Sequence, residues 1–166
     1  MMDAVFDAGP LIYLDAVGYM EAARVLYGIV IPDAVARELE RRPGSSGGAV
    51  PAMDGVEIRV PDESHIRRVE RGSPFVDAGE RAVIAVALEL GVPAVIDERR
   101  GRLRARMLGV ALTGAIGVLI KIHQTGHAHR TFTEDLDALN EAGMYIGDGL
   151  KRRVMERYRE IIGDAP

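Results

Sequence analysis

The chain contains no cysteine and no tryptophan, few other aromatic residues, and no long apolar segment. The lack of cysteine excludes a disulfide framework and a thiolate nucleophile, and it is typical of proteins from a reducing compartment. No apolar run reaches the roughly 20 residues that a membrane-spanning helix needs. Because the first expected strand starts almost at Met1, we expect no signal peptide, no membrane partner and a cytoplasmic location.

The length and composition are typical of a globular domain. A chain of 166 residues favours one domain with a sizeable core, and 48% hydrophobic with 28% charged residues gives no reason to expect disorder. The net charge of −4 provides no overall attraction to nucleic acid. All but two of the 21 basic residues are arginines, however, and several are bunched, so their distribution matters more than the total.

Strand and helix signals alternate along the chain, which predicts a parallel sheet with helices on both faces. The stretch from Pro43 to Gly55 is rich in Gly, Ser and Pro and has no periodicity, so we expect a flexible loop there. We expect strands at 4–6, 29–31, 56–60, 94–96, 110–112 and 144–146, and helices at 10–17, 19–27, 33–42, 63–71, 78–90, 101–108, 115–123, 134–141 and from 148 onward.

Four acidic residues are expected at one edge of this sheet. Asp7 and Asp97 each end an apolar strand, and ligands of parallel sheets bind beyond such strand ends. Glu38 and Glu80 share a helical face with apolar residues and therefore point inward. Buried acids are costly unless something pairs with them, and four together repel one another. Oxygen ligands suit Mg²⁺ or Mn²⁺, so the pattern predicts a divalent metal site.

Each of these acids also has an ordinary structural explanation. The two aspartates at strand ends would cap the helices that follow them. Asp77 and Glu80 have the spacing of a capping box. Glu38 would lie on the helix surface or pair with Arg41 or Arg42. The metal site is the simpler hypothesis, because it explains all four acids with one cause.

Four motifs, in this order and spacing, resemble those of PIN-domain proteins. The resemblance is greatest to the branch known as predicted nucleic-acid-binding proteins, which is related to the toxin ribonucleases of VapBC toxin–antitoxin pairs. It covers nearly the whole chain, including the closing G-M-Y-I-G-D-G-L. The motifs are D-A-G-P-L-I at 7–12, G-E-x-x-x-I-x-x-A at 79–87, I-D-E-R-R-G-R at 96–102, and T-G-x-x-G-V-L at 113–119.

The resemblance implies a fold and an activity. The fold is a three-layer α/β/α sandwich with a mainly parallel central sheet, forming a single PIN-like domain over 1–166 with a C-terminal helical extension at about 131–166. The activity is hydrolysis of RNA by acids that hold Mg²⁺ or Mn²⁺. The acids that match the family's catalytic and metal-binding positions are Asp7, Glu38, Glu80 and Asp97, with Glu98 as an additional metal ligand.

The resemblance also bears on substrate and partners. Thr113 matches a position near the site, where we expect it to contact the substrate. If the chain is the toxin of a toxin–antitoxin pair, its partner is a small antitoxin protein, and we also expect a homodimer. The stretch Arg42–Gly55 departs from the family pattern. The alternative function is a non-catalytic module on the same fold that binds nucleic acid or protein, in which the acids hold a structural ion or the surface serves a partner protein.

An arginine-rich segment follows directly on Asp97. Guanidinium groups bind phosphate oxygens through two parallel hydrogen bonds, so we expect Arg99 and Arg102 to contact RNA. A solvated helix face is the alternative explanation. Because aromatic residues make up only 5% of the chain, we expect recognition to depend on the RNA backbone and shape rather than on stacking.

Three histidines, His123, His127 and His129, lie close together near the end of an expected helix. Such a group raises the question of a zinc site. They fall in a turn that contains glycine, and no cysteine accompanies them. We therefore interpret them as part of a surface turn.

Overall fold

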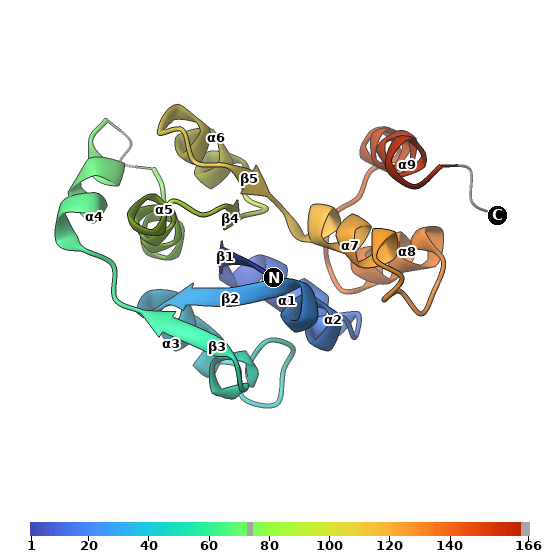
Figure 1. The fold of residues 1–166 in the computed structure, drawn as a ribbon, viewed down its shortest axis with the longest axis horizontal. Helices are drawn as coiled ribbons and strands as arrows, with labels where there is room; N and C mark the ends of the chain where they lie inside the picture. Colours follow the sequence, from blue (N-terminus) through green and yellow to red (C-terminus); the bar gives the residue numbers. More distant parts are fainter. Residues whose placement is uncertain (73–74, 164–166) are drawn as a thin grey trace.

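Five parallel strands form the centre of the molecule in a computed structural model that describes residues 1–72 and 75–163 (Figure 1). The strands pair in the order β3-β2-β1-β4-β5, and every pair is parallel. The predicted parallel sheet is therefore confirmed. The strands are β1 (Met2–Phe6), β2 (Tyr27–Pro32), β3 (Val56–Arg59), β4 (Ala94–Val95) and β5 (Leu112–Thr113).

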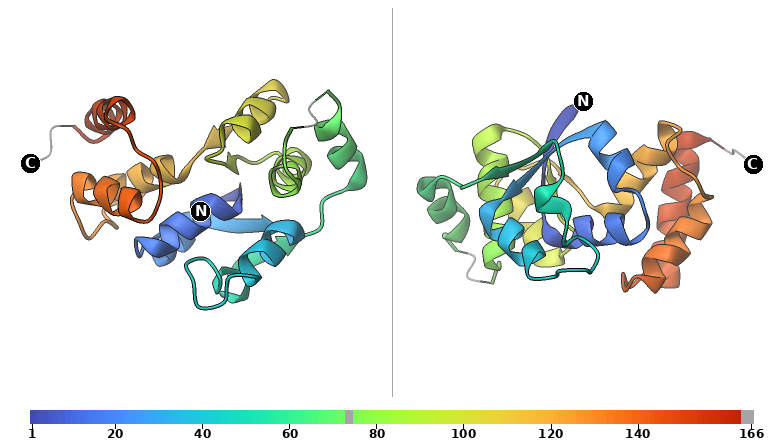
Figure 2. Two further views of the ribbon diagram at one scale, coloured as in Figure 1. Left: turned by 180° about the vertical axis from the view of Figure 1, so that it is seen from behind. Right: turned by 90° about the horizontal axis from the view of Figure 1, so that it is seen from below.

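Helices cover both faces of this sheet. Figures 1 and 2 show α4 and α5 on one side and α1, α2 and α7 on the other, which makes the three-layer α/β/α sandwich that was predicted. The helices are α1 (Ala8–Ala16), α2 (Met20–Leu26), α3 (Asp33–Glu40), α4 (Glu63–Glu70), α5 (Ala78–Leu90), α6 (Arg99–Met107), α7 (Ala115–Gln124), α8 (Phe132–Glu141) and α9 (Asp148–Ile162).

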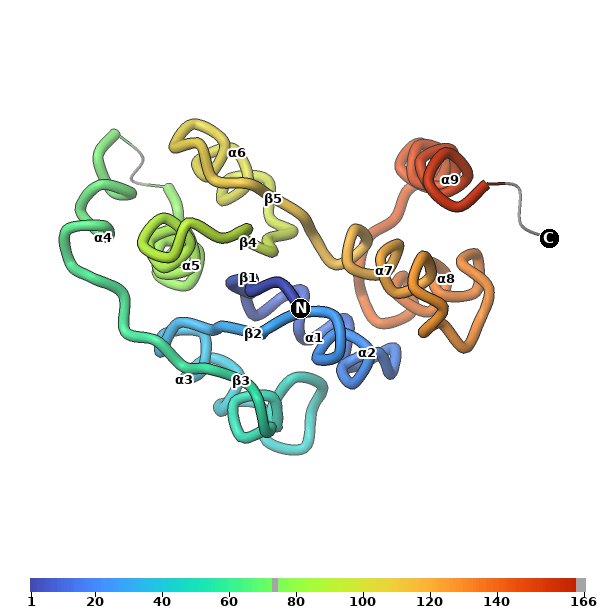
Figure 3. The backbone as a smooth tube through the Cα atoms, viewed as in Figure 1, coloured from blue at the N-terminus to red at the C-terminus, as the bar shows by residue number. Residues whose placement is uncertain are grey.

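Helix α5 shows how the sequence produces this core. Its residues 82–87 are all buried, because the helix packs against β1, β2 and β4 on one side and against α4 on the other. Asp77 and Glu80 form a capping box at its start, and Gly91 ends it in the left-handed conformation. The chain builds the β1–β3 half of the sheet first and crosses through α4 and α5 to the β4–β5 half (Figure 3).

Two predicted strands need correction. Strand β5 is Leu112–Thr113 rather than 110–112, because the amide of Val110 donates to the carbonyl of Ala105 and still belongs to the turn that ends α6. Residues 144–146 form no strand: the Met144 amide donates to the Leu139 carbonyl, so this segment completes the end of α8. Other predicted elements are present, with ends shifted by a few residues.

The segment expected to be a flexible loop, 43–55, folds as a series of turns against the body. It contains the short 3-10 helix η1 (Val50–Ala52), in which Val50 is buried. The amide of Gly47 donates to Oδ2 of Asp15, 2.6 Å away. These contacts hold the segment beside α1 and α3.

Helices α8 and α9 lie beyond α7, at the end of the molecule farthest from α4 (Figure 1). They belong to the predicted C-terminal extension 131–166, of which residues 164–166 lie outside the described part. The ring of Tyr158 in α9 stacks on Phe132 in α8 with the centroids 4.1 Å apart. No helix within the described ranges combines the length and the apolar character needed to cross a membrane.

The buried carboxylate of Asp135 joins this extension to the body. It accepts hydrogen bonds from Tyr19 Oη at 2.8 Å and Arg130 Nε at 2.8 Å, and lies 2.7 Å from His123 Nε2. The interpretation of the histidines as a surface turn is therefore wrong for His123, whose side chain is almost fully buried in α7. No sequence pattern indicated this network, because its members come from four separate segments.

Candidate active site

Asp7 and Asp97 follow two neighbouring strands at the centre of the sheet. β1 pairs with β4, and Phe6 is the register partner of Val95. The chain continues from β1 to β2 and β3 in one direction and from β4 to β5 in the other, so the strand order reverses between β1 and β4. Ligands of open parallel sheets bind in the crevice outside the strand ends at such a point. Both aspartates therefore flank the expected position of a site.

Asp7 is a buried acid that the helix beside it does not explain. It occupies the N-cap position of α1, but its side chain makes no cap hydrogen bond, and Pro10 at the third helical position has no amide hydrogen to donate. The pKa of Asp7 is raised to about 7, chiefly by burial; Asp77, Glu80 and Glu38 act in the same direction, and the Ala8 amide opposes them. The capping explanation fails for Asp7, and the predicted repulsion from other acids is present.

Three carboxylates from three elements converge on Gly79, near the start of α5. The point that a Cβ on Gly79 would occupy lies 3.4 Å from Oδ1 of Asp77, 3.5 Å from Oε2 of Glu38 and 3.6 Å from Oδ1 of Asp7. We call this group the acid cradle. Asp77 was predicted only as a helix cap and not as a site residue. Its position three residues before Glu80 was nevertheless a signal that it lies beside the predicted acids.

Glu80 is both a capping-box residue and a buried acid. Its Oε2 accepts a hydrogen bond from the Asp77 amide at 3.2 Å, and its own amide donates to Asp77 Oδ1 at 2.8 Å, so the capping box is real. Only 4% of Glu80 is exposed. Burial raises its pKa, with Asp77 and Glu98 acting in the same direction. A side chain at Gly101 would come within 2.7 Å of the Glu80 carboxylate, so the absence of one lets the start of α6 approach this acid.

One carboxylate oxygen of Asp97 faces the β5–α7 turn. Its Oδ1 accepts a hydrogen bond from the Ala115 amide at 2.9 Å, so it satisfies the start of α7 and not the start of α6. Its Oδ2 is buried and has no hydrogen-bond partner among the described residues. Burial raises the pKa of Asp97; the Ala115 amide and Arg102 lower it, and Glu98 raises it.

Two variants of Asp97 separate its structural bond from its charge. In metal-free protein, Asp97→Ala should unfold with about 1 kcal/mol less free energy than Asp97→Asn, because only asparagine keeps an oxygen for the Ala115 amide. Denaturant unfolding of the two variants in EDTA measures this difference. Equal stability of the two variants would show that the bond to Ala115 contributes nothing.

The other predicted site residues lie around these acids. Glu38 is exposed on α3, so the expectation that it points inward is wrong, although its carboxylate reaches the acid cradle; in the described structure it pairs with neither Arg41 nor Arg42. Glu98 lines a hollow of about 500 Å³ beside Glu80. Thr113 lies apart from the cradle: it lines a second hollow of about 540 Å³, which it shares with Asp97 and Arg102.

The arginines after Asp97 have three different positions. Arg99 and Arg100 are exposed and line the same hollow as Glu80 and Glu98, where they are available to a phosphate. Nη1 of Arg102 donates to the carbonyls of Ile96 at 2.6 Å and Thr113 at 3.0 Å, so this arginine supports the strand ends. Arg104 is buried, and its guanidinium donates to three carbonyls of residues 68–71. The arginine-rich segment therefore lies only partly on a solvated or ligand-facing surface.

The chemistry of these acids suits a divalent cation, although they do not form a coordination sphere as they stand. Within 1–72 and 75–163, no three acidic or histidine side chains are arranged to hold one ion. Mg²⁺ needs oxygen ligands at about 2.0–2.1 Å, so the carboxylates would have to move closer together to coordinate one ion. The space above Gly79, the raised pKa of Asp7 and the unpaired Oδ2 of Asp97 are nevertheless features that a hard cation would satisfy.

Comparison with known proteins adds a family to this geometry. The family model of the PIN domain matches residues 3–160, which is nearly the whole chain. No curated protein matches the chain closely enough to serve as a relative.

Proposed function

The chain belongs to the PIN-domain family, whose members are typically nucleases, and from this premise we propose that it is a Mg²⁺- or Mn²⁺-dependent ribonuclease that hydrolyses phosphodiester bonds of RNA. The observation that carries the proposal is the acid cradle, in which Asp7, Glu38 and Asp77 bring carboxylates from three elements to one point. A cluster of this kind at the switch point of a parallel sheet is a typical place for a ligand.

The residues of the chain have distinct tasks in this proposal. Asp7, Glu38 and Glu80 would hold the ion, with Asp97 and Glu98 completing its surroundings. When bound, the ion supplies a hydroxide nucleophile at neutral pH and positive charge for the developing phosphorane. Because the pKa of Asp7 is about 7, this carboxyl is partly protonated at neutral pH and must release its proton when the ion binds.

The arginines of α6 orient the substrate in the same scheme. Arg99 and Arg100 lie at the rim of the hollow that Glu80 and Glu98 line, so a phosphate bound there is next to the acids. Arg102 holds the carbonyls at the ends of β4 and β5 and so keeps Asp97 and Thr113 in place. In this proposal the acids and arginines bind and orient the phosphodiester, and the ion supplies the nucleophile, so no nucleophile from the chain is required.

A test of this proposal uses a pair of capping-box glutamates, Glu80 and Glu134. We expect purified wild-type protein to cleave single-stranded RNA with Mg²⁺ or Mn²⁺ and not in EDTA. Glu80→Gln keeps the size and hydrogen bonds of a capping-box residue but removes its charge, and should lower the cleavage rate by at least about 100-fold. Glu134→Gln makes the same change in the capping box of α8, remote from the acids, and should leave the rate unchanged.

Cleavage that persists in EDTA, or an unchanged rate in Glu80→Gln, would contradict the proposal. The non-catalytic binding module is the second candidate, and the observation that favours it is the absence of a preformed ion-binding group within the described ranges. In that case the chain binds RNA or another protein, and it cleaves no RNA with or without a divalent metal ion.

The toxin assignment and the partners are also proposals. They depend on the resemblance to the toxin ribonucleases, which implies a small antitoxin protein and fits a homodimer. A short reading frame next to the gene, encoding a protein that binds this chain and suppresses its activity, would support the assignment. The size of the purified protein in solution tests the homodimer.

A further inference from the structure

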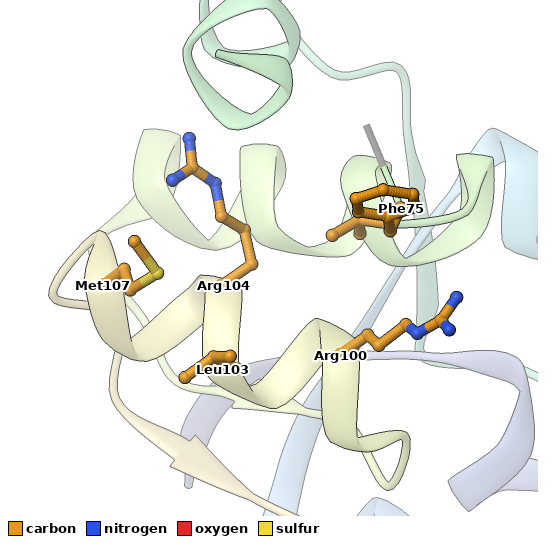
Figure 4. Close-up of a pocket in the computed structure, with 6 residues that line it drawn as sticks. Phe75, Arg100, Leu103, Arg104 and Met107 are labelled. Carbon is orange, nitrogen blue, oxygen red and sulfur yellow. The ribbon is translucent and has the colours of Figure 1, made fainter. Parts of the chain in front are cut away.

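A large aromatic side chain is exposed directly beside the acidic hollow. Phe75 lies two residues before Asp77 and is 73% exposed. With Leu103 and Met107 of α6, which are also exposed, it lines an apolar hollow of about 250 Å³ (Figure 4). Contiguous exposed apolar side chains are a feature of interaction sites.

This apolar hollow adjoins the acidic one. Phe75 and Arg100 line both of them. The guanidinium carbon of Arg100 lies 5.9 Å from the centre of the Phe75 ring, within the range of a cation–π contact. A ligand that fills both hollows therefore meets, in sequence, an apolar wall, an aromatic ring with a cation at its side, and a group of acids with arginines at the rim.

We propose that Phe75 stacks against a base of single-stranded RNA while the adjoining phosphate lies toward Arg99 and Arg100. This inference rests on the proposed ribonuclease function and adds a base subsite to it. A nucleotide matches the order of groups in the two hollows, because its flat apolar base and its anionic phosphate are adjacent. Stacking on an aromatic ring needs no particular base, so the subsite selects for unpaired bases rather than for a sequence.

The order of the charges along the two hollows favours RNA as the occupant. Arg100 lines both hollows and Arg99 lines the acidic one, so an anionic group is best placed next to the ring; the acids Asp77, Glu80 and Glu98 lie in the acidic hollow, where the proposed ion would neutralise them. A nucleic-acid strand brings one negative charge with each nucleotide. The shape agrees, since Leu103 and Met107 offer an apolar surface beside the ring and no charged group of their own. The composition of the chain predicts little base stacking. The proposal agrees with this, because it places stacking at the ring of Phe75.

The absence of tryptophan makes a direct test available. Phe75→Trp introduces the only tryptophan of the chain, and stacking on a base should quench its fluorescence. Single-stranded RNA added in EDTA, where the proposed hydrolysis does not proceed, should quench Phe75→Trp strongly. Duplex RNA of the same sequence should quench it far less. Tyr145→Trp is the matched control, because Tyr145 is 88% exposed and lies after α8, outside both hollows; it should respond to neither RNA.

Measurements of RNA binding and RNA cleavage test the base subsite separately from the proposed ribonuclease function. Phe75→Ala should weaken binding of single-stranded RNA about tenfold, and an abasic nucleotide at the stacked position should weaken wild-type binding similarly. Metal-dependent cleavage with unchanged RNA affinity in Phe75→Ala and no quenching in Phe75→Trp would overturn the subsite and leave the ribonuclease intact. Loss of a bound protein partner in Phe75→Ala, with RNA affinity unchanged, would assign the hollow to that protein. Absence of both binding and cleavage of RNA in the wild type would overturn both proposals.

Discussion

Replacing Asp7 with asparagine is expected to raise the melting temperature of the metal-free protein by roughly 10 °C at pH 8 and to change it little near pH 4. Asp7 is 9% exposed, and folding raises its pKa from 3.8 to about 7. A carboxyl with this pKa, once ionised, costs about 4 kcal/mol of folding free energy. Asparagine keeps the shape of the side chain and removes that cost.

The direction of the pH dependence follows from proton binding. Between about pH 4 and pH 7 the native state holds a proton on Asp7 that the unfolded chain has lost, so stability falls as the pH rises through this window. Above pH 7 Asp7 is ionised in both the native and the unfolded state, so this residue lowers the stability no further. Thermal melts from pH 4 to pH 8 in EDTA should therefore show a decline in the wild type that is much smaller in Asp7→Asn.

Two further measurements test whether the charge of Asp7 causes the difference in melting temperature between the wild type and Asp7→Asn. Asp3→Asn changes an exposed aspartate on the same strand and should shift the melting temperature by less than about 2 °C. Added Mg²⁺ should stabilise the wild type at pH 8 more than Asp7→Asn, because an ion bound to the native state favours it. A lower melting temperature in Asp7→Asn at pH 8 would show that the charge of Asp7 is stabilised rather than strained.

The second large effect is expected far from the acids, at Asp135. This residue has no exposed surface, and its carboxylate is shared by Tyr19, His123 and Arg130. Asp135→Ala leaves these three groups without their common partner, and loss of one member of a buried charged network typically costs 3–5 kcal/mol, about 10 °C in melting temperature here. The loss should be visible in thermal and denaturant unfolding.

A neighbouring aspartate provides the control for Asp135. Asp137 lies on the same helix and pairs with Lys151 at 2.6 Å, but both side chains are solvent-exposed. Removing an exposed pair of this kind costs about 0–1 kcal/mol, so Asp137→Ala should be close to wild type. Similar stability of Asp135→Ala and Asp137→Ala would mean that the buried network does not hold the C-terminal helices in place.

Much of the fold and part of the site could be predicted because the relevant signals are local. The apolar strand that ends in Asp7 and the capping box of α5 are readable over a few neighbouring residues. The topology rule for parallel sheets then places the ends of β1 and β4 together, as observed. The motif order that resembles the PIN domain agrees with the family match over residues 3–160.

What could not be predicted depends on contacts between distant segments. The hydrogen bond from the amide of Ala115 to Asp97, 18 residues earlier, had no signal in the sequence. Arg104 belongs to the arginine-rich segment after Asp97. No local signal indicated that its guanidinium would bind the carbonyls of Val69 and Arg71 at the end of α4. In both cases the partner is a backbone group, which leaves no distinguishing mark in the sequence.

The central position of β1 has a consequence for synthesis on the ribosome. β1 is made first, yet its partners are β2 and β4, so one of its edges stays unpaired until about residue 95 has been added. At roughly 5–20 residues per second this interval lasts on the order of ten seconds. A nascent chain released within it has an open strand edge that invites pairing with other chains, and it lacks β4 and the acids that follow it. Prematurely terminated fragments are therefore prone to aggregate and carry no complete active site.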